Sequence, residues 1–303
     1  FYGGARGRGV KPIAGADVWI ANPEASEDPG RLLLLVRNRE GYRQLCELLT
    51  RAYLVEGRRD RAEIRREWFA EIGCDGLLAL SGAHLGDVGE ALLNGNFDLA
   101  GARARAWEAI FPGAFYLEVQ RYGQLQQEAV VQQTADLAGE LGLPLVATHP
   151  VQFMNRDDFR AHEARVCIAE GYVLGDSRRP RIYTEEQYFK TQDEMVELFA
   201  DLPEALENTL EIARRCNIEL TLGENFLPDF PTPDGMSLAD FLVAEAEAGL
   251  EKRLAELFPD PAVRAERRPE YDERLVFECK TIIQMGYPGY FLIVADFINW
   301  AKN

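Results

Sequence analysis

Up to about residue 222, short apolar runs alternate with longer amphipathic ones, and this alternation constrains the fold more than any other feature. The short runs are rich in Leu, Val, Ile, Phe and Tyr, as buried strands are. We interpret five of them as strands: Lys11–Ala21, Leu32–Arg37, Gly76–Ser81, Phe115–Gln120 and Leu145–Thr148. Apolar strands separated by helices predict a parallel sheet covered on its outer face, and this number of units favours a barrel over an open sheet.

Helical periodicity is found between the strands, at Glu40–Val55, Arg61–Ile72, Val88–Leu93, Leu99–Ile110, Gln124–Leu141 and Asp158–Glu170. From Thr184 the pattern is mostly helical, with capping-box spacing at both Thr184 and Thr191. Pro203–Arg215 reads as a helix with proline in its first turn. Asn217–Leu222 then predicts one last strand.

The stretch Leu227–Gly235 holds three prolines and a glycine, which predicts an interdomain linker. Beyond it, Leu238–Phe258, Glu270–Met285 and Tyr290–Lys302 read as helices. The last of these is apolar on one face, so we expect it to pack against something outside this chain. We expect both ends of the chain to be cuts in a longer protein.

Composition excludes several classes of protein. The 303 residues carry a formal net charge of -17, which argues against free-standing nucleic-acid binding. The five cysteines are too widely spaced for a zinc knuckle or a redox pair, and they suit a reducing cytoplasm. No run of 18 apolar residues predicts a membrane span, and no G-x-x-x-x-G-K phosphate loop or G-x-S-x-G elbow occurs.

Catalytic groups of a β/α barrel gather on the loops after the strands. The residues there are Asp17, Asn38, Ala83-His84, Arg121-Tyr122 and His149–Gln152. Two histidines and one aspartate are few ligands for a cluster of two or three metals. Two interpretations of His149 stay open: a metal ligand, or a strand-end histidine that hydrogen-bonds a loop backbone. We expect His84 to be a helix-entry residue and His162 to pack on a helix.

The run Gly286–Lys302, GYPGYFLIVADFINWAK, resembles the start of the palm domain in bacterial replicative DNA polymerase III alpha subunits, the family C polymerases. Other stretches are similar to the same family: Gly9–Asp17, Asn38–Tyr42, Asp158–Glu163, Asp193–Ala213 and Leu222–Pro231. The resemblance covers essentially the whole chain. These long runs are far more specific than a short motif.

The resemblance implies an α/β fold. Residues 1–228 would be a PHP (polymerase and histidinol phosphatase) domain, a distorted β/α barrel whose first strands are missing here. Residues 229–235 would be the proline-rich linker, and residues 236–303 the mainly helical start of the polymerase palm. The palm carboxylates of the family would lie beyond Asn303, so we expect no catalytic residue in this chain.

Family members with an active PHP site carry a metal cluster and act as proofreading exonucleases. Their pattern has Glu near Asp17, His near Arg31, Cys near Ala83, and His-Gly where this sequence has Tyr122-Gly123. Neither proline nor alanine can coordinate a metal, and Arg31 would repel one. Losing even one or two ligands should cripple a cluster.

The family segment Ala-Thr-Asn-Asp-x-His is here Ala147–Gln152. Pro150 and Gln152 therefore replace an Asp and a His, and His149 stands where the family has Asn. Such departures resemble those of proteobacterial alpha subunits, whose PHP domain has lost its activity. The resemblance thus implies vestigial site positions and no metal in this chain; the positions are Asp17, Arg31, Ala83, Tyr122, His149, Pro150 and Gln152.

The resemblance implies that the full chain is a cytoplasmic DNA-directed DNA polymerase that needs Mg²⁺. Its partners would be primer-template DNA, deoxynucleoside triphosphates, a proofreading exonuclease subunit docked on the PHP domain, and the sliding clamp and other holoenzyme subunits bound elsewhere; no membrane is implied. The alternative is a PHP domain that retains metal-dependent 3′-5′ exonuclease or phosphoesterase activity. That alternative needs an intact H-x-H motif in N-terminal strands outside this chain.

Overall fold

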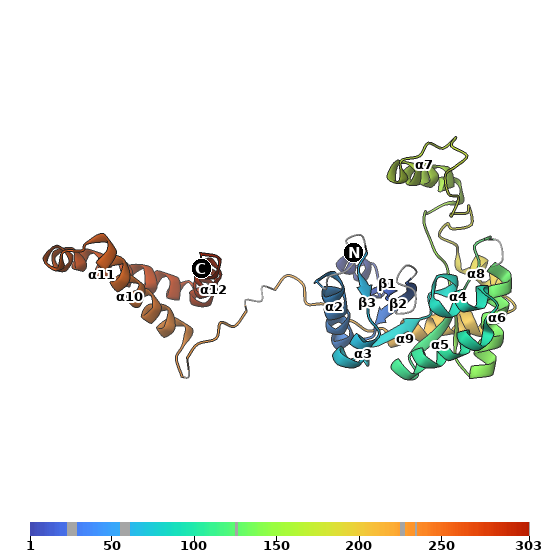
Figure 1. The fold of residues 1–303 in the computed structure, drawn as a ribbon, viewed down its shortest axis with the longest axis horizontal. Helices are drawn as coiled ribbons and strands as arrows, with labels where there is room; N and C mark the ends of the chain where they lie inside the picture. The colour runs from blue at the N-terminus through green and yellow to red at the C-terminus, as the bar shows by residue number, and fades with distance from the viewer. Residues whose placement is uncertain (23–28, 55–60, 125–126, 225–227, 234, 303) are drawn as a thin grey trace. The chain divides into compact units, whose positions relative to one another are not determined.

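The computed structural model describes the chain except for residues 23–28, 55–60, 125–126, 225–227, 234 and 303. The described residues form two compact units, Phe1–Leu220 and Thr221–Asn303, which we call unit one and unit two. Figure 1 shows strands only in unit one, whereas unit two consists of helices and extended chain. The predicted domain boundaries at residues 228 and 235 stay predictions.

Unit one contains a six-stranded sheet in the order β3-β1-β2-β4-β5-β6. The strands are β1 Gly15–Ile20, β2 Gly30–Val36, β3 Glu63–Ile64, β4 Leu77–Leu80, β5 Phe115–Gln120 and β6 Leu145–Thr148. Strands β4, β5 and β6 are parallel, as predicted, but β2 is antiparallel to both β1 and β4. The prediction of a parallel sheet is therefore wrong for its first half. The nine residues between β1 and β2 are too few for the crossover that parallel neighbours need.

Helices fill the rest of unit one: α1 Tyr2–Arg6, α2 Arg39–Leu54, α3 Glu67–Ile72, α4 Asp87–Leu93, α5 Phe97–Ile110, α6 Gln127–Leu141, α7 Phe159–Glu170, α8 Gln192–Leu198 and α9 Pro203–Arg215, with 3-10 turns at Ala83–Leu85 and Arg156–Asp158. The α/β class and the alternation of strands with helices are confirmed. The capping box at Thr191 is present at the start of α8.

Three local predictions are wrong. Residues 63–64 form strand β3, which pairs with β1, within the stretch predicted as the helix Arg61–Ile72. Thr184 opens a turn closed by the Gln187 amide, not a helix. The stretch Asn217–Leu222 is not a strand, because the amide of Leu220 donates to a side chain, the Tyr2 hydroxyl at 3.1 Å, and not to a strand backbone.

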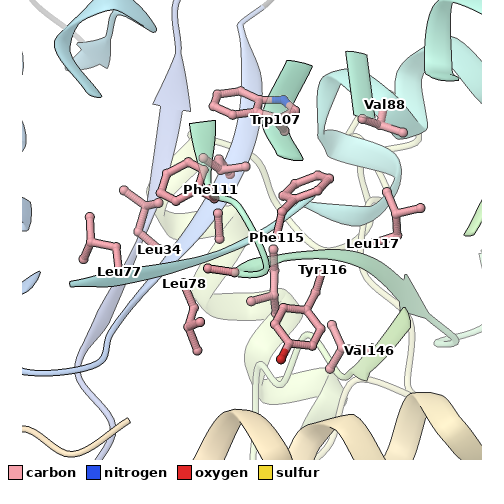
Figure 2. Close-up of a cluster of buried hydrophobic side chains, with 14 of the residues drawn as sticks. Leu34, Leu77, Leu78, Val88, Trp107, Phe111, Phe115, Tyr116, Leu117 and Val146 are labelled. Carbon is pink, nitrogen blue, oxygen red and sulfur yellow. The ribbon is translucent and has the colours of Figure 1, made fainter. Parts of the chain in front are cut away.

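The interior beside the sheet is built from aromatic and branched side chains. All four residues of β4 are buried, and so are the first five of β5. Trp107, Phe111 and Phe115 gather there with Leu34 and other aliphatic side chains (Figure 2). The Trp107 indole also donates to the carboxylate of Asp87 at 3.0 Å, so its polar nitrogen is satisfied.

Helix α2 meets the sheet at a contact that only glycine permits. A β-carbon on Gly41 would lie 1.8 Å from the carbonyl oxygen of Gly76, which precedes β4. One turn further along, the Gln44 side chain accepts a hydrogen bond from the Gly76 amide at 3.1 Å and donates to Asp75 at 2.6 Å. The buried amide side chain therefore satisfies backbone at the strand entrance.

The beginning and the end of unit one are tied together. Lys11 donates to the last-turn carbonyl of Ala213 in α9 at 2.6 Å and to the Asn217 side chain at 2.7 Å. A cation near a helix C-terminus is favourable because it faces the negative end of the helix dipole. The Tyr2 hydroxyl bonds both Ile218 and Leu220. We call these contacts the corner clasp.

Unit two consists of α10 Leu238–Leu257, α11 Pro261–Gln284 and α12 Pro288–Lys302, and its α10 and α11 begin at side-chain caps, Ser237 and Asp260. Few of its side chains are buried, whereas Phe277, Phe291, Phe297 and Trp300 are exposed. Within the described residues, no single helix is long and apolar enough to cross a membrane. Helices α11 and α12 reach that length and composition only as a pair bent by 116°, which is weak evidence for a span.

Candidate functional site

A cavity of about 700 Å³ opens where β4, β5 and β6 end, and we call it the strand-end cavity. Six of the seven predicted site residues line it: Asp17, Arg31, Tyr122, His149, Pro150 and Gln152. The seventh, Ala83, is buried between two lining residues, Gly82 and His84. The carboxyl ends of the parallel strands β4, β5 and β6 meet at one edge, which is why the loops that carry Ala83, Tyr122 and His149 converge. Asp17 and Arg31 lie instead within the antiparallel pair of β1 and β2.

An ion pair stands at the β1–β2 side of the strand-end cavity. Arg31 Nη2 lies 2.5 Å from Asp17 Oδ2, with the side chains 30% and 55% exposed. The register of the hairpin sets Arg31 opposite Trp19, and the guanidinium lies 5.4 Å from that indole ring. The Asp17 carboxylate is therefore already paired with a side-chain cation.

A buried carboxyl lies deeper in the strand-end cavity, at Glu118 of β5, which is only 4% exposed. It accepts hydrogen bonds from the Gly82 amide at 3.0 Å, from the Gln120 side chain at 3.1 Å and from the Thr148 hydroxyl. Burial raises the pKa of Glu118 above its ordinary value. Sequence analysis missed this residue, although a lone carboxylate inside the apolar run FYLEVQ was a usable signal.

His84 lies in the turn Ala83–Leu85, consistent with a helix-entry position. Its Nε2 lies 3.1 Å from the Tyr122 hydroxyl, which itself donates to Gln124 at 3.0 Å. The hydroxyl proton is therefore used, so His84 Nε2 carries a proton and donates to the Tyr122 oxygen. Burial lowers the pKa of His84, and burial raises the pKa of Tyr122 to about 12. Both groups are neutral at pH 7.

His149 makes the backbone hydrogen bond that one of its two interpretations requires. Its Nε2 donates to the carbonyl of Glu186 at 2.9 Å, and burial lowers its pKa. Its neighbours join the same loop, because Gln152 donates its amide to Gln187 and the Gln187 side chain donates to Pro150. His162 is buried in α7 and does not line the strand-end cavity, but its ring packs against Tyr183, which does.

These residues do not fit a metal cluster. Asp17 is paired with a guanidinium, Glu118 is enclosed by three donors, and His84 uses its Nε2 in a hydrogen bond. In the part of the chain that the structure describes, no three His, Cys, Asp or Glu side chains are grouped to hold a metal ion. The site is instead a network of polar groups that mostly hydrogen-bond one another, although the buried Nδ1 of His149 has no hydrogen-bond partner among the described residues.

Two family models match the chain. The PHP domain model matches residues 1–122, and the model of the bacterial DNA polymerase III alpha NTPase domain matches residues 240–303. Over its whole length the chain is 57% identical to the DNA polymerase III subunit alpha of Neisseria meningitidis serogroup A. It is 51% identical to the subunit of Pseudomonas aeruginosa and 48% identical to that of Escherichia coli K12.

The chain belongs to the family of bacterial DNA polymerase III alpha subunits. It spans 27% of the length of the Neisseria relative and 26% of the Escherichia one. The resemblance seen in the sequence is thereby confirmed, including its proteobacterial character. The fold is the distorted β/α barrel of a PHP domain, followed by the helices that match the polymerase model.

Proposed function

We propose that the chain is part of a replicative DNA-directed DNA polymerase. In the full-length protein, the 3′ hydroxyl of a primer would attack the α-phosphorus of a deoxynucleoside triphosphate paired with template DNA, and pyrophosphate would leave. Palm carboxylates outside this chain would hold Mg²⁺, which would stabilise the charge on the phosphates. The observation that carries this proposal is the 57% identity to a DNA polymerase III alpha subunit along the entire chain. The sliding clamp and other holoenzyme subunits would bind regions outside this chain, in the cytoplasm.

Unit one would contribute a scaffold and no catalysis. Its vestigial positions at the strand-end cavity would be Asp17, Arg31, Ala83, Tyr122, His149, Pro150 and Gln152, and the domain would dock a proofreading exonuclease subunit. The pairing of Arg31 with Asp17 supports this, because a guanidinium 2.5 Å from a carboxylate disfavours a metal ion at the same oxygen. The hydrogen bonds of His84 and His149 support it further.

A second candidate is a residual metal-dependent 3′-5′ exonuclease or phosphoesterase. It is favoured by the carboxyl groups of Asp17 and Glu118, which line the strand-end cavity together with His84 and His149. Its remaining ligands would have to come from residues outside this chain.

Metal content separates the two candidates. The full-length alpha subunit is exposed to Zn²⁺ and Mn²⁺, desalted, and its metal counted per chain by mass spectrometry. The scaffold proposal expects a ratio near zero, with Mg²⁺-dependent primer extension intact and no 3′ exonuclease activity. Two or three retained ions per chain, together with release of nucleotides from a 3′ end, would establish the second candidate instead.

A further inference from the structure

The strand-end cavity has the size and the lining of a small-molecule site. Its volume of about 700 Å³ lies within the range of about 300–1,000 Å³ that is usual for pockets that bind drug-sized ligands. Three apolar side chains of its lining, Leu85, Val151 and Ile182, are 47%, 40% and 53% exposed, and we call them the apolar rim. Apolar walls that enclose a few placed polar groups are typical of a ligand-binding cavity.

The polar part of the lining is held in place by a chain of hydrogen bonds. His84 donates to the Tyr122 hydroxyl, which donates to Gln124. The Gln124 side chain in turn donates to the carbonyl of Ile182 at 3.0 Å. This chain connects the loops that follow β4 and β5 with the segment that contains Ile182. A ligand that meets groups already fixed binds at a lower cost in entropy.

A second set of hydrogen bonds fixes the loop after β6. Gln187 is 3% exposed, and its side chain donates to the Pro150 carbonyl at 3.2 Å and accepts from the Thr184 amide at 2.9 Å. The Gln187 carbonyl also accepts from the Gln152 amide at 2.8 Å. The backbone of Gln152 is therefore fixed, whereas its side chain is exposed and lines the strand-end cavity.

Three polar groups of the lining remain available to a ligand. Because His84 Nε2 carries the proton, His84 Nδ1 is an acceptor, and it forms no hydrogen bond within the described part of the chain. The side-chain amide of Gln152 and the hydroxyl of Tyr183 also have no hydrogen-bond partner there. A ligand would thus meet one acceptor, one hydroxyl and one amide that both donates and accepts.

The charges of the lining balance one another. Among the described residues that line the cavity, Arg31 is the single arginine or lysine, and it is paired with Asp17. Burial favours the uncharged form of Glu118, whose pKa it raises, and of His84 and His149, whose pKa values it lowers. A phosphate group would therefore meet a cation that is already paired, and it would be repelled by Asp17.

Charged groups behind the lining also have partners. Lys190 lies 2.8 Å from Glu186, and its side chain is only 6% exposed. Arg181 precedes the rim residue Ile182, but it interacts electrostatically with Glu163. These described surroundings do not turn the strand-end cavity into a site for anions. An uncharged ligand fits it best, because such a ligand has no charge to remove from water.

Among uncharged molecules, a planar ring with nitrogen donors and acceptors matches this lining. A hydrocarbon would cover Gln152 and Tyr183 without hydrogen-bonding them, which costs free energy. A sugar would also bring hydroxyl groups against Leu85, Val151 and Ile182. A planar heterocycle has its polar groups at the edge and two largely apolar faces. Its edge can meet the three available polar groups while its faces contact the apolar rim.

We propose that the strand-end cavity binds an uncharged nitrogen heterocycle about the size of a nucleoside. His84 Nδ1 would accept from a ring N–H or amino group, the Tyr183 hydroxyl would donate to a ring nitrogen or carbonyl, and the Gln152 amide would complete the contact at the edge. This inference goes beyond the scaffold function and does not depend on which partner the domain docks.

The test uses adenosine and cytidine, which are uncharged at pH 7, and compares each with its own 5′-monophosphate. Binding to the full-length alpha subunit is measured by saturation-transfer NMR titration without divalent metal ions. We expect at least one nucleoside to bind with a Kd of about 1 mM or lower. Its monophosphate should bind about tenfold more weakly or worse, because the phosphate finds no unpaired cation in the cavity.

Three variants locate the bound nucleoside. Gln152→Leu should weaken binding about tenfold, and Tyr183→Phe by a smaller factor of about three. Val151→Trp should fill the mouth of the cavity and weaken binding about tenfold or more. The matched control is Gln192→Leu, the same substitution at an exposed position of α8 outside the lining, which should leave the Kd unchanged. The midpoint of thermal unfolding shows whether each variant is folded.

Four results would overturn the proposal. The first is an absence of saturation transfer to both nucleosides. The second is binding that Gln152→Leu and Val151→Trp both leave unchanged, because the nucleoside would then be bound elsewhere on the alpha subunit. The third is a monophosphate that binds as tightly as its nucleoside, which would mean a phosphate site. The fourth is nucleoside binding that requires Mn²⁺, which would mean a metal-dependent site.

The failure of this inference is distinct from the failure of the scaffold function. Two or three retained metal ions per chain would overturn the scaffold function, whatever the nucleosides do. Loss of nucleoside binding in a metal-free subunit would overturn the ligand site alone.

Discussion

Strand β5 runs from the core of unit one to the strand-end cavity, and its side chains show how differently the two regions are held. Phe115 and Leu117 are completely buried among apolar neighbours. Glu118 is almost as deeply buried, but three hydrogen-bond donors surround it. At the rim, Asp17 and Arg31 pair while still in contact with water. The core is stabilised by close packing and the exclusion of water. The strand-end cavity is stabilised by a few polar pairs, each of which can be removed by a single substitution.

The largest effect is expected in the core. Trp107→Ala should lower the free energy of unfolding by about 3–5 kcal/mol, because it leaves a cavity and removes the indole hydrogen bond to Asp87, whose carboxylate keeps Arg66 as its partner. Urea denaturation of the chain measures the loss. Trp300→Ala in α12 is the matched control: its indole is 82% exposed, so the change should stay below about 0.5 kcal/mol. Equal losses at the two tryptophans would mean that burial of the side chain does not set its contribution to stability.

Glu118 tests whether a residue of the strand-end cavity can contribute nearly as much to the free energy of unfolding as a core residue. Glu118→Ala should cost about 2–3 kcal/mol, because the Gly82 amide and the donors of Gln120 and Thr148 lose their acceptor. Chemical denaturation at pH 5 provides the measurement. A loss under about 0.5 kcal/mol would mean that water replaces the carboxyl oxygens without penalty.

The same variant should show a diagnostic pH dependence. The pKa of Glu118 is raised in the folded state, so the folded protein binds more protons than the unfolded one between the ordinary pKa of 4.5 and the raised value. Its stabilisation is therefore complete below pH 4.5 and is lost as pH rises through the folded pKa. The stability gap between wild type and Glu118→Ala should narrow as pH increases. Glu118→Gln cannot titrate at this position. The difference in unfolding free energy between Glu118→Gln and Glu118→Ala should therefore stay constant as pH increases.

The smallest effect is expected at the rim. A double-mutant cycle of Asp17→Asn and Arg31→Gln should give a coupling energy of about 1 kcal/mol or less, because both groups remain partly solvated. Raising the salt concentration should reduce it further. A coupling energy above about 3 kcal/mol would mean that the ion pair of Asp17 and Arg31 contributes as much to stability as core residues do. The rim and the interior would then not differ in this respect.

Periodicity located most of the fold, and the reason is physical. Strands β5 and β6 have the predicted limits because an apolar run of that length, bounded by turn residues, has few other structures open to it. The convergence of Tyr122 and His149 followed from the rule that parallel strands end at one edge. The remaining features of the fold and site depend on contacts between residues far apart in the sequence, which hydrophobic periodicity does not predict.

Strand β2 is antiparallel to β1 because the connection between them is short. The predicted strand Asn217–Leu222 does not form, because the Tyr2 hydroxyl hydrogen-bonds the backbone of both Ile218 and Leu220. Glu118 escaped notice because a charged residue in a strand is ordinarily assigned to a solvent face. Which residues of the strand-end cavity were once ligands came from the family resemblance and not from spacing, so their vestigial character stays a prediction.

The corner clasp has a mechanical consequence. Lys11 and Tyr2 hold the segment before β1 against the residues that follow α9. Force applied between these two points would load that corner first, and its few hydrogen bonds would break in turn before any tension reached the ladders of the sheet. The corner clasp therefore shields the shape of the strand-end cavity from tension applied between those two segments.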